Sequence, residues 1–212
     1  METIDYREKK YYNLALGLAF FTIIYNVAEG LISMYLGFED ESLALFGFGA
    51  DSFIEVISGL GILHMITRIK MNPHSQRDRF EKTALKITGV AFYLLTVGLV
   101  VSSVYNIWTG HKPQTTFWGI VISGISIVMM GALVLGKRKA GNALSSDPIL
   151  ADANCTLVCL YMSVVLLLSS GIYELTGIGF IDSLGGIGLA WFAFNEGREC
   201  FKKIKSDKYC SC

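Results

Sequence analysis

The chain has 212 residues, of which 52% are hydrophobic and 17% are charged, and its formal net charge is zero. Soluble domains carry about a quarter charged residues, so this composition excludes an ordinary soluble fold and predicts a single integral membrane domain in a lipid bilayer. The balanced charge offers no basic excess for binding nucleic acid, and no nucleic-acid partner is expected.

Six apolar runs follow one another along the chain, and each approaches or exceeds the roughly 20 residues that a membrane-spanning helix requires. The predicted fold class is therefore an all-α membrane protein with six transmembrane helices. We expect a cytoplasmic N-terminus over 1–11, a six-helix domain over 12–200 and a short cytoplasmic tail over 201–212. The six runs cover residues 12–36, 43–67, 83–108, 117–135, 149–175 and 178–194.

Basic residues predict how the helices are oriented. They cluster before the first run, between the second and third, between the fourth and fifth, and after the sixth, whereas the other three connections carry almost none. This alternation places both termini in the cytoplasm, and we interpret the clusters as loops facing lipid head groups. The clusters are Arg7, Lys9 and Lys10; Arg68, Lys70, Arg77, Arg79 and Lys82; Lys137, Arg138 and Lys139; and Lys202, Lys203, Lys205 and Lys208.

Two of the runs each carry a pair of metal-competent side chains at positions i and i+4. Asp51 and Glu55 lie in the second run, and Cys155 and Cys159 lie in the fifth. This spacing places both members of a pair on one helix face. Because carboxylates in the hydrocarbon region are costly, they are expected to face a cation, a polar partner or a water-filled cavity.

The second and fifth runs cross the membrane in opposite directions, so that side-by-side packing would bring the four side chains together. Asp51 would then lie level with Cys159, and Glu55 with Cys155. Two oxygen and two sulfur donors suit a tetrahedral site for Zn²⁺ or Cd²⁺. The alternatives are that the cysteines pack as small apolar residues and that the carboxylates bond to Ser or Asn.

Three further polar residues are candidates for a gate or a proton path. Asn26 and Glu29 share one face of the first run, and their alternative role is to hydrogen-bond this helix to the second. Asp152 lies near the cytoplasmic end of the fifth run, where it either lines the inner mouth or caps the helix. Asp182 opens the sixth run and is expected to be a favourable charge at a helix N-terminus.

These motifs resemble the cation diffusion facilitator family. SLALFGFGADSFIEVISGL is similar to that family's second helix, in which S-x-A-L precedes two metal ligands four residues apart, and Asp51 and Glu55 fall on these positions. ILADANCTLVCLYMS is similar to the fifth helix, A-D-x-x-H-x-x-x-D, with Cys155 and Cys159 at the ligand positions. Asn26 and Glu29 resemble polar residues of the family's first helix.

The resemblance implies a secondary active transporter, not an enzyme, that exports a divalent metal in exchange for protons by alternating access. Its site would hold transported Zn²⁺, or Cd²⁺ because two cysteines soften the ligand set, and it would need no prosthetic group. A homodimer formed through the transmembrane helices is implied as well. The chain is expected to be a short family member without the usual C-terminal cytoplasmic domain, located in a bacterial inner (cell) membrane.

Two other functions remain open at this point. One is a thiol-dependent carrier for soft metals of the mercury or copper type, which would use chiefly Cys155 and Cys159. The other is a membrane regulatory subunit that transports nothing. A thiol redox enzyme fits poorly, because a continuous helix holds cysteines at i and i+4 in a geometry unsuited to a disulfide. The tail cysteines, Cys210 and Cys212, are either free thiols or a cytoplasmic trap for soft metal.

Overall fold

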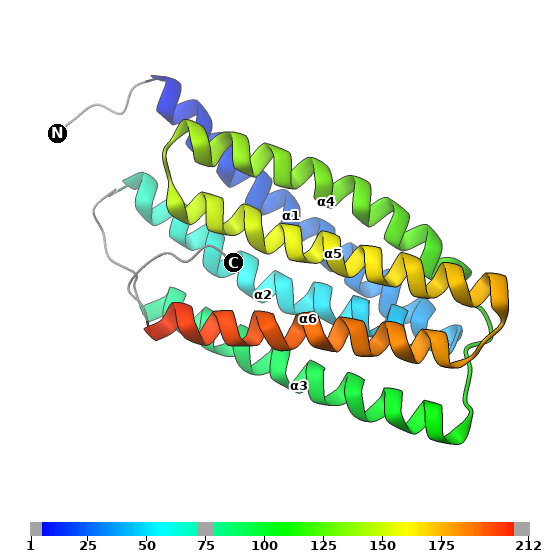
Figure 1. Cartoon of the computed structure of the whole chain (residues 1–212). Coiled ribbons are helices and arrows are strands. Elements are labelled where there is room, and N and C mark those ends of the chain that lie inside the picture. The colour runs from blue at the N-terminus through cyan, green and yellow to red at the C-terminus, as the bar shows by residue number, and fades with distance from the viewer. Residues whose placement is uncertain (1–5, 72–78, 206–212) are drawn as a thin grey trace.

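A computed structural model describes residues 6–71 and 79–205, which form a bundle of six α-helices without a strand (Figure 1). The predicted all-α fold is confirmed over these residues. The helices are α1 (Tyr6–Glu39), α2 (Leu43–Met71), α3 (Arg79–Thr109), α4 (Phe117–Ala143), α5 (Asp147–Thr176) and α6 (Phe180–Lys205).

Successive helices run in opposite directions, so the beginning of α1 and the end of α6 lie at the same end of the bundle (Figure 1). This end carries the described basic clusters of the sequence, and we call it the basic end. The α1–α2, α3–α4 and α5–α6 connections lie at the opposite end, which we call the outer end. Arg77, Lys208, Cys210 and Cys212 lie outside the described residues.

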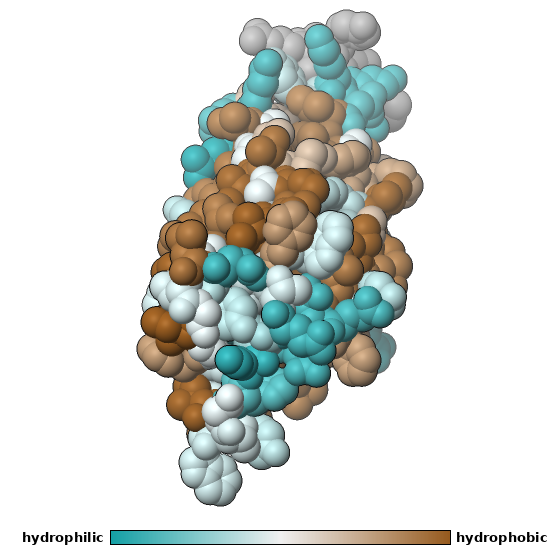
Figure 2. Space-filling model, turned by 90° about the vertical axis from the view of Figure 1, so that its right-hand side faces the viewer, coloured by the Kyte–Doolittle hydropathy of each residue, from teal (hydrophilic) through white to brown (hydrophobic). Residues whose placement is uncertain are grey.

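The surface of the bundle is that of a multi-pass membrane protein. Five of the six helices, α1 to α5, are long and apolar enough to cross a membrane. Figure 2, seen from the outer end, shows hydrophobic side chains on the flank of the bundle between hydrophilic groups at its ends. The sixth helix is less apolar because Asn195, Glu196, Arg198 and Glu199 follow its hydrophobic part, but it runs alongside the others (Figure 1).

Several helices are longer than the apolar runs that predicted them. The prediction that Lys137, Arg138 and Lys139 form a loop is wrong, because α4 continues to Ala143. Lysine, arginine and alanine favour helix, and Lys137 is only 1% exposed. Likewise, α6 continues to Lys205, inside the region predicted as a tail.

The helices pack most extensively as three pairs, which are α1 with α2, α3 with α6, and α4 with α5. Small residues of α6 permit its close approach to two other helices. A Cβ atom added at Gly185 would lie 2.4 Å from Ser169 Oγ of α5, and one added at Gly186 would lie 2.9 Å from Ser103 Oγ of α3. These glycines therefore serve packing within the bundle.

Carboxylates from other helices satisfy the backbone N–H groups that begin α2 and α4 at the outer end. Asp182 lies in the first turn of α6, as expected, and it also accepts hydrogen bonds from Ser42 Oγ at 2.7 Å and Leu43 N at 2.8 Å. Glu174 of α5 accepts from Thr115 Oγ1 at 2.7 Å and from the backbone N–H of Thr116. Asp182 thus joins α6 to α2, and Glu174 joins α5 to α4.

Candidate metal site

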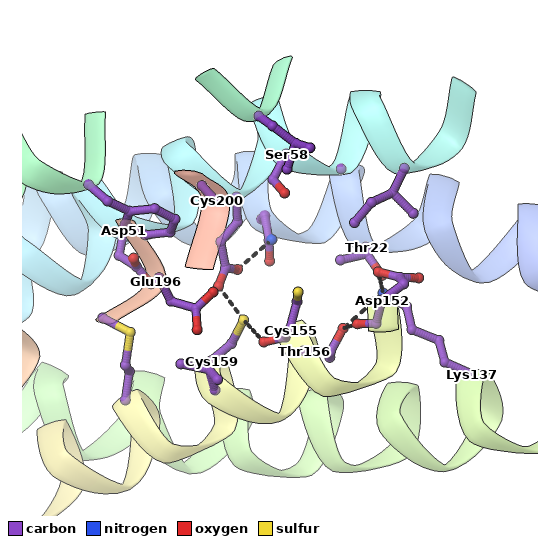
Figure 3. Close-up of a pocket in the computed structure, with 18 of the residues that line it drawn as sticks. Thr22, Asp51, Ser58, Lys137, Asp152, Cys155, Thr156, Cys159, Glu196 and Cys200 are labelled. Atoms are coloured by element: carbon purple, nitrogen blue, oxygen red, sulfur yellow. Dashed lines mark hydrogen bonds and ion pairs between the residues drawn. The ribbon is translucent and has the colours of Figure 1, made fainter. Parts of the chain in front are cut away.

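A cavity of about 50 Å³ lies inside the bundle and is lined by side chains from all six helices (Figure 3). By the same measure a single water molecule needs about 10–15 Å³, so the cavity has room for a small cation together with a few water molecules. All four side chains predicted as metal ligands line it. They are Asp51 and Glu55 of α2, and Cys155 and Cys159 of α5.

Glu55 and Cys159 form a direct contact between α2 and α5. The Cys159 thiol donates a hydrogen bond to Glu55 Oε1 and is also 3.2 Å from the Cys155 carbonyl oxygen. The second carboxylate oxygen, Glu55 Oε2, accepts a hydrogen bond of 2.8 Å from Asn26 Nδ2 of α1. Glu55 is therefore held between two helices, with one carboxylate oxygen facing a thiol.

The predicted register is wrong for Glu55, which contacts Cys159 rather than lying level with Cys155. Two features of the packing explain the shift. The second helix packs mainly on α1 and the fifth mainly on α4, so the α2–α5 register follows from their partners. In addition, Cys155 Sγ accepts a hydrogen bond from Lys203 Nζ of α6 at 3.4 Å.

Asp51 is buried in the cavity wall without a full set of hydrogen bonds. Its side chain is 2% exposed, and Oδ1 has no hydrogen-bond partner among the described residues. A buried carboxylate oxygen in this condition is an available acceptor for a ligand. No three His, Cys, Asp or Glu side chains of residues 6–71 and 79–205 converge as they stand around a single ion position.

The polar residues of α1 bond this helix to α2. Asn26 lines the cavity and donates to Glu55, whereas Glu29 is 6% exposed and lies outside the cavity lining. Glu29 accepts hydrogen bonds from Tyr25 OH at 2.8 Å and from Ser52 Oγ of α2 at 3.1 Å. The interhelical bonding expected as the alternative role is thus present for both residues.

Asp152 lines the cavity on the basic side and forms a buried ion pair with Lys137 of α4. The distance from Lys137 Nζ to Asp152 Oδ1 is 2.9 Å, and the same ammonium group donates to Thr156 Oγ1 at 2.8 Å. In Figure 3, Asp152 and Lys137 lie on the opposite side of the view from Asp51. Of the two expected roles, lining the inner mouth and capping the helix, this position agrees with the first.

Three cavity-lining residues of α6 were missed by the sequence analysis. Glu196, Cys200 and Lys203 lie beyond the last apolar run, which ends at residue 194, and Lys203 belongs to a basic cluster, so none of them was a candidate for the site. A signal was present, because Glu196 and Cys200 have the same i, i+4 spacing as the two predicted pairs. Lys137 was missed for a similar reason, since it was assigned to a loop.

The formal charges of the cavity do not balance. Four carboxylates face two ammonium groups, which leaves an excess of two negative charges, equal to the charge of one divalent cation. Since isolated buried charges are costly, this lining favours the uptake of either two protons or a divalent cation. The carboxylates are Asp51, Glu55, Asp152 and Glu196, and the ammonium groups are Lys137 and Lys203.

Comparison with known proteins covers nearly the whole bundle. A family model described as the cation efflux transmembrane domain matches residues 18–207, which include all four predicted ligands. Transmembrane protein 163 of Xenopus laevis is 25% identical to this chain over 187 residues. The aligned region covers 88% of this chain and 64% of that protein, so the chain spans less than two thirds of the length of its relative.

Proposed function

This chain belongs to the cation efflux family, and we propose that it exports a divalent metal cation, chiefly Zn²⁺, from the cytoplasm in exchange for protons. The observation that carries this proposal is the contact between Glu55 and Cys159. It joins α2 to α5 inside a cavity whose acidic residues exceed its lysines by two charges.

Glu55 and Cys159 are the first two ligands in this proposal, and Asp51 and Cys155 complete the set by side-chain rotation within the same cavity. Carboxylate and thiolate ligands together suit Zn²⁺, and the sulfur also accommodates Cd²⁺. The metal is the cargo, and the proposal requires no prosthetic group.

Proton exchange follows from the chemistry of these ligands. In the empty site, a proton lies between the Cys159 sulfur and the Glu55 carboxylate. Metal binding requires a thiolate and a carboxylate, so the arriving cation releases protons, and protons arriving from the other side release the cation. Access from alternate sides of the membrane would complete the cycle.

Glu29 and Asp152 keep their predicted gate or proton-path roles in this proposal, whereas Asn26 has a positioning role instead. Asn26 positions the Glu55 carboxylate through its 2.8 Å hydrogen bond. Asp152, with Lys137, forms the gate on the basic side of the cavity. Glu29 and its hydroxyl partners, Tyr25 and Ser52, form a candidate proton path beside the cavity.

The proposal includes the orientation and setting predicted from the sequence. The basic end faces the cytoplasm, as the distribution of lysine and arginine requires. A bacterial inner membrane and a homodimer through the transmembrane helices remain predictions, and the relative reported above comes from a frog.

A soft-metal carrier is the second candidate function, because three thiols line the cavity, those of Cys155, Cys159 and Cys200. Purified protein in proteoliposomes separates the two candidates when Zn²⁺, Cd²⁺ and Hg²⁺ fluxes are compared. Replacing Cys155 and Cys159 by serine should leave part of the Zn²⁺ flux, since the carboxylates remain. Replacing Cys210 and Cys212 by serine is the matched control and should leave all fluxes unchanged.

Two outcomes of this comparison would contradict the proposal. Complete loss of flux in the cavity double variant, with a wild-type preference for Hg²⁺, would establish the soft-metal carrier. Absence of any metal flux from the wild-type protein alone would indicate a regulatory subunit that does not transport.

A further inference from the structure

One face of α6 presents three polar side chains to the cavity, and the first of them, Glu196, lies on the same side of the view as Asp51 (Figure 3). Glu196, Cys200 and Lys203 lie at i, i+4 and i+7, which is one stripe of a helix. Cys200 is 5% exposed and Lys203 is 8% exposed. The adjacent Lys202 has a side chain that is 56% exposed and is paired with Glu199. The two neighbouring lysines of the basic cluster therefore differ in exposure, and only Lys203 is buried.

The α6 stripe meets Cys155 of α5. Lys203 Nζ lies 3.4 Å from Cys155 Sγ. Glu196 and Cys200 are each close enough to Cys155 and Lys203 to interact with both electrostatically. The Lys203 ammonium group therefore contacts one of these donors, Cys155, and interacts electrostatically with the other two, Glu196 and Cys200.

Within the cluster, the two thiols lie toward the basic end: Cys155 lies nearer that end than Cys159, and Cys200 lies nearer it than Glu196. Cys155 precedes Cys159 by one turn on a helix that begins at the basic end. Cys200 is five residues from Lys205, where α6 ends at the same side. A cation entering from the basic end would pass Cys155 before Cys159, and Cys200 before Glu196.

The donor chemistry of the cluster suits a soft divalent metal. Two sulfur ligands, one oxygen ligand and a water molecule make a four-coordinate site that Zn²⁺ or Cd²⁺ accepts. A buried lysine is costly unless it has partners, and here its partners are the potential ligands themselves. The Lys203 ammonium group thus acts as a tethered monovalent cation. Because it already supplies a positive charge, Cys155, Glu196 and Cys200 can share the cavity without meeting at one point.

We propose that Glu196 and Cys200, together with Cys155, form a second binding site for a thiophilic divalent cation, and that the Lys203 ammonium group takes the place of the metal when none is bound. Cys155 is shared with the Glu55 site and serves the two sites in turn. Metal binding moves the ammonium group out and releases the thiol protons to solvent. The site itself is independent of transport, whereas its role as an entry station rests on the proposed function.

Cd²⁺ binding to the purified full-length chain tests the site, with ultraviolet absorption reporting cadmium–thiolate bonds and equilibrium dialysis reporting affinity. Every protein carries Cys210→Ser and Cys212→Ser, so that the tail thiols do not contribute. Asp51→Asn with Glu55→Gln disables the outer ligands. This background should still bind Cd²⁺ with thiolate absorption, and adding Cys200→Ser should reduce the absorption by about half and weaken binding by about tenfold or more.

Lys203→Met tests the tethered cation. It should tighten Cd²⁺ binding by about tenfold, because one competing positive charge is removed. Lys202→Met, in the exposed neighbour, is the matched control and should leave the affinity unchanged. If the background variant does not fold, Cys200→Ser and Glu196→Gln in the chain with intact Asp51 and Glu55 should each weaken Cd²⁺ binding, and Cys200→Ser should also reduce the cadmium–thiolate absorption.

The inference is overturned if Cys200→Ser leaves both absorption and affinity unchanged, or if Lys203→Met fails to tighten binding. These results are distinct from failure of the proposed function. A wild-type protein that gives no metal flux, but whose Cd²⁺ binding depends on Cys200, would refute transport and keep the site.

Discussion

At the scale of single residues, Glu55 of α2 is the cavity side chain that contacts both α5 and α1. One carboxylate oxygen contacts the Cys159 thiol, and the other accepts a hydrogen bond from Asn26. Groups that orient a metal ligand typically influence affinity without touching the metal. The site therefore depends on α1 as well as on the two helices that supply the ligands.

Asn26→Ala tests this dependence. The substitution removes the donor to Glu55 Oε2, and we expect Zn²⁺ affinity to fall by about tenfold, as is typical for a residue that orients a ligand. Isothermal titration calorimetry on the purified protein measures the change. Asn13→Ala is a control, because Asn13 is exposed and bonded to Lys70; equal affinities in the two variants would contradict a positioning role for Asn26.

The sequence predicted the cavity residues of α2 and α5 because each pair lies within one helix. A spacing of four residues fixes which side chains share a face. It carries no information on how far one helix slides along another, so the Glu55–Cys159 register could not be predicted. Glu196 and Cys200 were missed because local charge resembled a solvated tail, whereas their burial depends on the packing of α6.

At the scale of helices, the Lys137–Asp152 pair joins α4 to α5. Both side chains are almost completely buried, so removing one partner leaves an uncompensated charge. Lys137→Met should lower the free energy of unfolding by about 3 kcal/mol or more, measured in detergent micelles. Lys139→Met, at an exposed position of the same helix, should change it by less than about 0.5 kcal/mol.

A second variant makes the ion-pair test specific. Adding Asp152→Asn to Lys137→Met removes the stranded charge, and most of the lost stability should return. A double variant that is no more stable than Lys137→Met would show that the lysine contributes by packing and not by pairing with Asp152.

The close approach of α6 to α5 depends on Gly185. Gly185→Ala would place a methyl group 2.6 Å from Ser169 Cβ and 2.4 Å from its hydroxyl oxygen, which should cost about 1–3 kcal/mol of stability. Gly171→Ala is the matched control on α5, because nothing lies within 4 Å of its added Cβ. That control should gain about 0.5–1 kcal/mol, and a loss of similar size in both variants would contradict the packing explanation.

At the scale of the whole molecule, the apolar runs predicted the number and order of the described helices. Their length and composition suffice because every backbone group in a bilayer must be satisfied within its own helix. The helix ends were predicted less well, because lysines and glutamates that favour helix extend α4 and α6 past the apolar region. The positions of Lys137 and Lys203 in the cavity follow from these extensions.

In the proposed function, the bundle as a whole would couple metal to protons through one small cavity whose carboxylates outnumber its lysines. Because its ligands must lose protons to bind a cation, Zn²⁺ affinity should rise as the pH rises and fall as it drops. An acidic compartment on the outer side would therefore drive metal out of the site in that direction.

The most direct test is Zn²⁺ flux into proteoliposomes that have an acidic lumen and enclose both a zinc-sensitive and a pH-sensitive dye. The proposal predicts Zn²⁺ entry with a simultaneous rise in lumenal pH, at least tenfold slower in Glu55→Gln and unchanged in Glu199→Gln. Zn²⁺ entry that is no faster than in protein-free vesicles, or equally fast with Glu55→Gln, would contradict it.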